Sequence, residues 1–239
     1  MFKRKSISKN EQVGKSELTS EKAIDVNQQS PKELEIDQVI QNLEVSRNND
    51  FSTYQIYADR EEVSLEVIER ILTLSEKNEL QIRNAHISYV EKICNRLNAS
   101  YPISFIYDIR SCNSDVLKFW EPQKQSFEER FESLKLVDSK GFRTIVFCSN
   151  PLDGDTFELV EILTPHSDFI IVEITKKLEE FLFESELIDS EKVKIAEEVL
   201  KIQSVNWLLN LGEKLKNNSS ICWDPDTREF LESKIGQLN

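Results

Sequence analysis

The side chains in this sequence that could do chemistry cluster at the ends of three apolar runs, at residues 101–109, 144–148 and 169–174, with Glu173 inside the third. If these runs are parallel strands, their carboxyl ends meet at one edge of a sheet, where α/β proteins place functional groups. The sequence therefore predicts a polar pocket at that edge, although ordinary loop polarity and helix capping would explain the same residues. The candidate pocket residues are Arg110, Ser111, Cys112, Cys148, Ser149, Asn150, Asp153 and Glu173.

Metal binding and hydrolysis are the first chemistries to consider for such a set. Cys112 and Cys148 could approach one another at adjacent strand ends, but a metal site needs further thiolate or imidazole ligands. The chain has only His86 and His166, which also gives little support to a hydrolytic triad. The five glycines form no phosphate-binding loop. We therefore expect no metal site, and we leave the catalytic residues unassigned.

The charge of the chain limits its partners. The formal net charge is -13, and acidic and basic residues balance over residues 1–48, so the excess of acid lies in the rest of the chain. Binding to a nucleic-acid backbone needs a basic stripe, and no such stripe is visible. An acidic surface suits a soluble protein that meets a basic partner. We expect a protein partner, with no direct contact to nucleic acid.

Neither a membrane nor a secreted location is expected. No apolar run approaches the roughly 18 residues that a spanning helix needs. The basic residues near Met1 precede a polar stretch, which is not how a secretory signal is built. The four widely spaced cysteines suit reduced thiols, and the sequence predicts a cytoplasmic protein.

The elements that would position the candidate pocket form three parts. Residues 1–29 are polar, a composition that predicts a flexible tail. Residues 30–49 hold an N-terminal amphipathic helix that begins at Ser30-Pro31, and its apolar stripe packs on the body or docks on a partner. The stripe, which gives our candidate partner-binding residues, consists of Ile36, Val39, Ile40 and Leu43.

Residues 50–239 alternate strand and helix patterns, which predicts right-handed βαβ units with a parallel sheet. Because no dinucleotide signature is present, we favour an α/β fold of the partial TIM-like (β/α) barrel type over a doubly wound sheet. The expected strands are 52–58, 80–83, 101–109, 144–148, 169–174 and 220–223. The expected helices are 64–77, 87–98, 126–140, 156–163, 190–216 and 224–238.

One string is distinctive enough to suggest a family. Residues 115–122 read Asp-Val-Leu-Lys-Phe-Trp-Glu-Pro, residues 126–130 read Ser-Phe-Glu-Glu-Arg, and residues 141–144 read Gly-Phe-Arg-Thr. Together with Cys148 and with Leu152-Asp153, they resemble the C-terminal part of the barrel of radical S-adenosylmethionine proteins. The resemblance covers about residues 80–235.

This resemblance implies a [4Fe–4S] cluster and S-adenosylmethionine. The family holds its cluster with three cysteines in a Cys-x3-Cys-x2-Cys loop, but no cysteine precedes Cys94 in this chain. Arg110 stands where the family has a glycine, and Ser149 stands where it has an acidic residue. We therefore expect no cofactor, although the resemblance implies these two.

Three functions are compatible with these features of the sequence. The first is a cluster-less relative that acts as a non-catalytic binding or assembly subunit of a larger complex. The second is an enzyme with a remodelled pocket at the barrel mouth. The third is a radical S-adenosylmethionine component that a partner chain completes, as in a host-defence or mobile-element system.

Overall fold

The computed structural model describes residues 31–48, 51–59, 62–74, 77–121, 124–149, 156–173 and 205–238. The predicted tail, the candidate residues Asn150 and Asp153, and residues 190–204 of the last long predicted helix lie outside these ranges.

The centre of the fold is one seven-stranded sheet whose strands stand in the order of the chain, from β1 to β7. β1 pairs with β2 in the antiparallel sense, and every later pair is parallel. This confirms the predicted α/β class. The strands are β1 (Glu44–Asn48), β2 (Phe51–Tyr57), β3 (Asn78–Arg83), β4 (Ile103–Asp108), β5 (Arg143–Ser149), β6 (Phe169–Glu173) and β7 (Ile221–Trp223).

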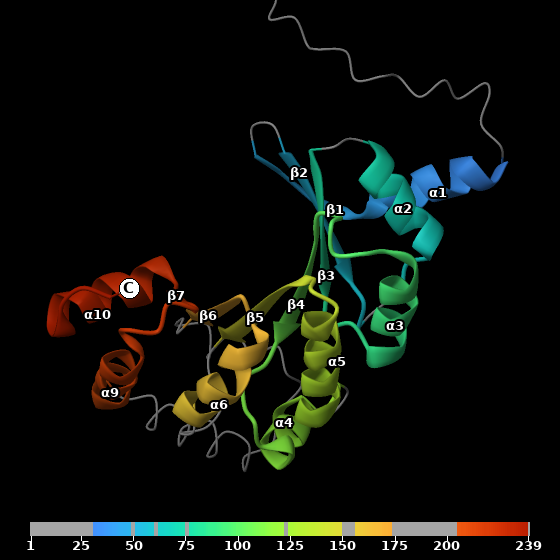
Figure 1. The fold of residues 1–239 in the computed structure, drawn as a ribbon. Helices are drawn as coiled ribbons and strands as arrows, with labels where there is room; N and C mark the ends of the chain where they lie inside the picture. The colour runs from blue at the N-terminus through green and yellow to red at the C-terminus, as the bar shows by residue number, and fades with distance from the viewer. Residues whose placement is uncertain are drawn as a thin grey trace, which may run out of the picture.

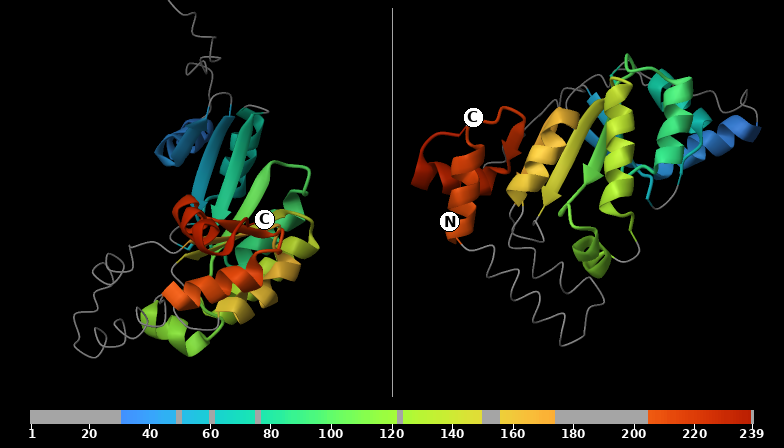
Figure 2. Two further views of the ribbon diagram at one scale, coloured as in Figure 1. Left: turned by 90° about the vertical axis from the view of Figure 1, so that its left-hand side faces the viewer. Right: turned by 60° about the horizontal axis from the view of Figure 1, so that its bottom comes forward.

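The helices α2, α3, α5 and α6 lie along one face of the sheet (Figures 1 and 2). Right-handed crossovers between strands that follow one another in order must all lie on the same side, so this single layer follows from the strand order. The arrangement is that of a barrel left open. The helices are α1 (Pro31–Asn42), α2 (Leu65–Leu74), α3 (Ile87–Arg96), α4 (Ser114–Trp120), α5 (Phe127–Ser139), α6 (Thr156–Leu163), α9 (Val205–Leu215) and α10 (Pro225–Ile235), with a 3-10 turn η2 at Thr164–His166.

The core lies between this helical layer and the sheet. Side chains alternate along each strand, and those on the helix-covered face, such as Leu80, Phe105, Val146 and Val172, are buried. Most side chains on the other face of β3, β5 and β6 are only half-buried. No helix in the described ranges is long and apolar enough to cross a membrane.

The predicted apolar stripe of α1 packs mainly on the body. Ile40 is buried, Ile36 and Leu43 pack against the core, and α1 contacts α2. Val39 stays 37% exposed. The assignment of these residues to a partner surface remains a prediction.

Local sequence signals explain where α5 starts and stops. The Ser126 hydroxyl accepts a hydrogen bond from the Glu129 backbone N–H, while the Glu129 carboxylate accepts one from the Ser126 N–H. This capping box was expected from the sequence. Gly141, just beyond the helix, has a φ of +77°, a left-handed conformation that glycine adopts without strain. Both ends of α5 are therefore fixed, which also fixes the position of Arg130 in its first turns.

Candidate functional site

A charged cluster is buried beside the carboxyl end of β4, with Glu121 at its centre. The Glu121 side chain is 2% exposed, and its Oε2 accepts a 2.7 Å hydrogen bond from Arg130 Nη2. Its Oε1 lies 3.6 Å from Arg110 Nε and 3.5 Å from Lys124 Nζ. Three cations thus surround one carboxylate.

The two helices after β4, α4 and α5, bring this cluster together. Asn113 caps α4 by accepting hydrogen bonds from the N–H groups of Asp115 and Val116, and Glu121 is the residue at the C-cap of that helix. Arg130 comes from α5, which contacts α4 (Figure 1). The Trp-Glu-Pro and Glu-Arg strings therefore meet through Glu121 and Arg130.

The electrostatic balance keeps Glu121 ionised. Burial disfavours the charged carboxylate, but the attraction of Arg130, Lys124 and Arg110, together with the hydrogen bond from Arg130, outweighs that penalty. The pKa of Glu121 therefore lies below its ordinary value. An ionised glutamate with this many partners is suited to holding two helices and a strand end together.

A second polar network joins the ends of β3 and β4. The Asp108 carboxylate accepts hydrogen bonds from Arg83 Nη2 at 2.9 Å and from Asn84 Nδ2 at 2.8 Å. Arg130 Nη1 also donates to the Asp108 carbonyl, which links this network to Glu121. The Arg83 guanidinium lies over the rings of Tyr57 and Phe147, at 5.6 Å and 5.1 Å. The charged side chains at the ends of β3 and β4 are therefore paired with groups of the same protein.

The candidate pocket residues face different ways. Arg110 turns to Glu121, and the Ser111 hydroxyl accepts a hydrogen bond from the Asn113 N–H at 2.8 Å. Cys148 is buried in the core on the helix-covered face, and Cys112 is half-buried. The Ser149 hydroxyl donates to the Glu173 carboxylate at 2.9 Å. The structure brings together two pairs, Arg110 with Glu121 and Ser149 with Glu173, and the assignment of a pocket stays a prediction.

The thiols do not fit an iron–sulfur cluster. Cys94 lies on α3 and packs against the core, where burial raises its pKa, Cys148 is a core residue of β5, and Cys222 lies on β7. A cluster needs several thiolates that converge on one loop. In the described ranges no three cysteine, histidine or acidic residues are grouped so that they could hold a metal ion.

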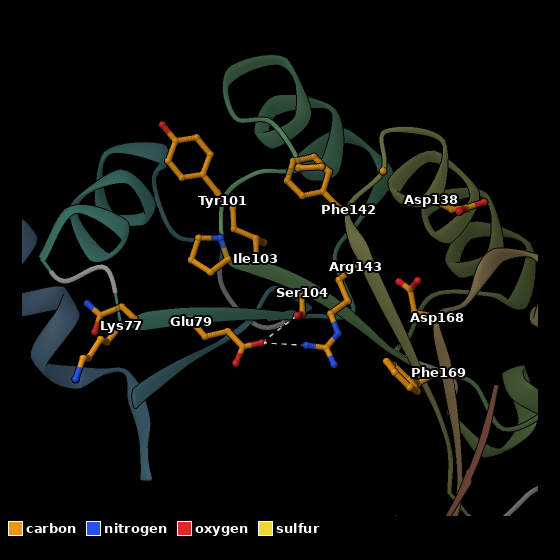
Figure 3. Close-up of a pocket in the computed structure, with 14 residues that line it drawn as sticks. Lys77, Glu79, Tyr101, Ile103, Ser104, Asp138, Phe142, Arg143, Asp168 and Phe169 are labelled. Atoms are coloured by element: carbon orange, nitrogen blue, oxygen red, sulfur yellow. Dashed lines mark hydrogen bonds and ion pairs between the residues drawn. The ribbon is translucent and has the colours of Figure 1, made fainter. Parts of the chain in front are cut away.

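A large pocket lies at the opposite end of the sheet, where the sequence analysis predicted no functional residues. It has a volume of about 710 Å³ and is lined by the amino ends of β3 to β6 and the loops that lead into them (Figure 3). Near Glu121, by contrast, a cavity of about 10 Å³ lies between Asp59, Asn84, Lys124, Gln125 and Arg130. The sequence signal for the large pocket was the charged residues that precede the apolar runs, such as Lys77, Glu79, Arg143 and Asp168.

Comparison with known proteins identifies no family. No family model and no curated protein matches the chain. One similar solved structure is a mutant of spore photoproduct lyase, with 12% sequence identity and a TM-score of 0.44. The match covers 80% of this chain and 65% of that one, so this chain spans less than two thirds of its length. The likeness is too distant to bear on function.

Proposed function

We propose that this protein is a cluster-less relative of the radical S-adenosylmethionine barrel that acts as a non-catalytic binding or assembly subunit of a larger complex. The observation that carries the proposal is the cluster around Glu121. Arg110 and Arg130 fill the space beside the carboxyl end of β4 with ion pairs to Glu121 that are internal to the fold, and the more exposed Lys124 adds a third. An α/β enzyme would keep such groups free for a substrate.

The distribution of the cysteines supports the same proposal. The residues whose sequence resembles that family, from 115 to 144, build the framework of α4, α5 and β5. The four thiols, in contrast, lie on or after four separate elements and do not converge. A chain that keeps the framework without the reactive centre is suited to binding rather than to radical chemistry.

An enzyme with a remodelled pocket has less support. It needs five side chains to face one cavity, those of Arg110, Ser111, Cys148, Asp153 and Glu173. Asp153 lies outside the described residues, and Cys148 lies on the helix-covered face while Glu173 lies on the other. A component that a partner chain completes is a special case of the binding subunit, and the experiment below separates the two.

The test is to purify the full chain under anaerobic conditions from its native host, with its partners retained, and to measure mass, iron, sulfide and S-adenosylmethionine binding. We expect a complex larger than the 27.9 kDa chain, with a partner in fixed stoichiometry. We expect no cluster on the isolated chain.

A stoichiometric iron–sulfur cluster on the isolated chain would overturn the proposal. A cluster found in the complex but lost when the partner is removed would support the special case in which the partner supplies the cluster.

A further inference from the structure

The large pocket at the amino ends of β3 to β6 offers carboxylates to a ligand. Asp168 is the best placed, because its Oδ2 accepts hydrogen bonds from the Thr144 N–H at 2.8 Å and from the Thr144 hydroxyl at 3.3 Å. These bonds fix the direction of the carboxylate. In the part of the chain that the structure describes, no hydrogen bond reaches its Oδ1.

Two further carboxylates line the same pocket. Glu79 accepts a hydrogen bond from the Ser104 hydroxyl, and its Oε1 lies 3.7 Å from Arg143 Nη1. Asp138 Oδ2 lies 3.0 Å from His166 Nδ1. Three acidic side chains thus line the pocket, against two basic ones, Arg143 and Lys77.

The two basic side chains leave room for a third cation near Asp168. Arg143 points toward Glu79, and its guanidinium lies 5.3 Å from the centre of the Phe169 ring. Lys77 stands at the far end of the pocket from Asp138 and Asp168 (Figure 3). The charge of Arg143 is therefore offset by Glu79, and that of Lys77 is remote from Asp168.

Aromatic side chains supply apolar contact in this pocket. Tyr101 is 41% exposed and stands at the pocket edge, and its hydroxyl has no hydrogen bond among the described residues (Figure 3). Phe169 lies half-buried on the other side. Because Arg143 already lies against the Phe169 ring, the exposed ring is that of Tyr101, which can contact the aliphatic and apolar parts of a segment whose cation binds Asp168.

We propose that this pocket binds a lysine or arginine side chain on an exposed segment of a protein partner. The inference rests on the proposed role as a binding subunit and names the chemistry of its partner. The net charge of -13 would attract such a segment over a distance. A volume of about 710 Å³ is more than one side chain fills, so the residues next to the basic one also find space.

The probe is a capped nonapeptide with one central arginine between leucines, titrated into the ¹⁵N-labelled full chain at low salt. The control peptide carries citrulline, which has nearly the same shape without the charge. Spermidine is titrated separately as a free cation. We expect the arginine peptide to shift the amide signals of Ala99 and Gly141, which line the pocket, and the citrulline peptide to leave them in place.

Variants locate the contact. Asp168→Asn keeps an oxygen to accept from Thr144 but removes the charge, and it should raise the peptide Kd about tenfold, which is typical of a lost charge-assisted hydrogen bond. Tyr101→Ala should raise it about threefold through the lost ring contact. The matched control, Asp226→Asn, removes an exposed carboxylate on α10 and should leave the Kd unchanged.

Equal Kd values for Asp168→Asn and the unchanged chain would overturn the inference. Equal binding of the citrulline peptide would do the same, as would shifts with spermidine but not with the arginine peptide. Iron and sulfide are measured on the same sample, because the iron–sulfur content tests the proposed function while the peptide Kd tests the pocket. A cluster found together with pocket-dependent peptide binding contradicts only the function, whereas a cluster-free complex with pocket-independent binding contradicts only the pocket.

Discussion

Glu121 shows what a buried carboxylate does when it has more than one cation. It joins α4, α5 and the end of β4 through Arg130, Arg110 and Lys124. The sequence identified the string that contains Glu121 and Arg130, and it placed Arg110 at a strand end. It could not predict that these side chains meet, because Glu121 and Arg130 lie nine positions apart across a helix end and come together only when α4 packs on α5.

Removing this charge should destabilise the fold. Glu121→Gln leaves Arg130, which is 3% exposed, without its counter-charge, so we expect a loss of about 3 kcal/mol in the free energy of unfolding at pH 7. Urea unfolding measures the loss. Glu229→Gln, an exposed site on α10, is the control and should change stability by less than about 0.5 kcal/mol.

The same variant gives a pH test. Because the pKa of Glu121 is lower in the folded protein than in the unfolded chain, its contribution is complete above the unfolded pKa of about 4.3. It disappears as the pH falls through the folded pKa. The stability gap between the unchanged chain and Glu121→Gln should therefore hold from pH 7 to about pH 5 and narrow below about pH 4. A gap that stays constant to pH 3 would contradict this account.

The pKa values of two buried tyrosines lead to a further prediction for single residues. Burial raises the pKa of Tyr107, whose hydroxyl binds Ser133, and the pKa of Tyr89, whose hydroxyl donates to the Val63 carbonyl. Because both side chains stay neutral in the folded protein, their contribution to stability is complete below the unfolded pKa of about 10 and is lost progressively as the pH rises above it.

Alkaline titration followed by tyrosine absorbance should show two residues that ionise only as the chain unfolds. In 6 M guanidinium they should titrate near pH 10 with the others. Tyr107→Phe should remove one of the two delayed residues, and a normal titration of all five tyrosines in the folded chain would contradict the prediction.

At the scale of elements, sequence patterns located most strands and helices to within a few residues. The pattern of apolar residues is strong where a face is buried, as in β4, whose side chains are all buried except Asp108. It failed for β1, because Glu44–Asn48 contains one apolar residue, Val45, and mixes charged and polar residues. Such a composition is typical of an edge strand, where polar and charged side chains prevent pairing with a strand of another chain. It also missed α4, whose Asn113 cap was the available signal.

The capping box of α5 can be tested directly. Ser126→Ala removes the hydroxyl that accepts from the Glu129 N–H, and we expect a loss of about 1 kcal/mol, measured as the free energy of unfolding. The control is Ser233→Ala on α10, where the exposed hydroxyl only bonds to the Phe230 carbonyl within the helix. Equal effects of the two variants would show that the box does not fix the start of α5.

At the scale of the whole molecule, stability should be highest at the middle of the sheet. β4 and β5 have parallel partners on both sides and the helix α5 above them, whereas β1 pairs only with β2 in the described ranges. Local opening is easiest where buried contacts are few. Native-state hydrogen exchange should therefore show amides of Phe105 and Val146 exchanging only through global unfolding and those of β1 exchanging faster. Equal protection of β1 and β4 would contradict this expectation.

The strand order also bears on how the chain folds while the ribosome makes it. Each strand of the sheet pairs with the strand synthesised just before it, from β2 onward. A growing chain of this design does not have to wait for a distant segment, since every new βα unit finds its neighbour already outside the exit tunnel. Contacts that are short in sequence favour fast folding. The sheet can therefore be assembled one strand at a time, in the order in which the strands leave the ribosome.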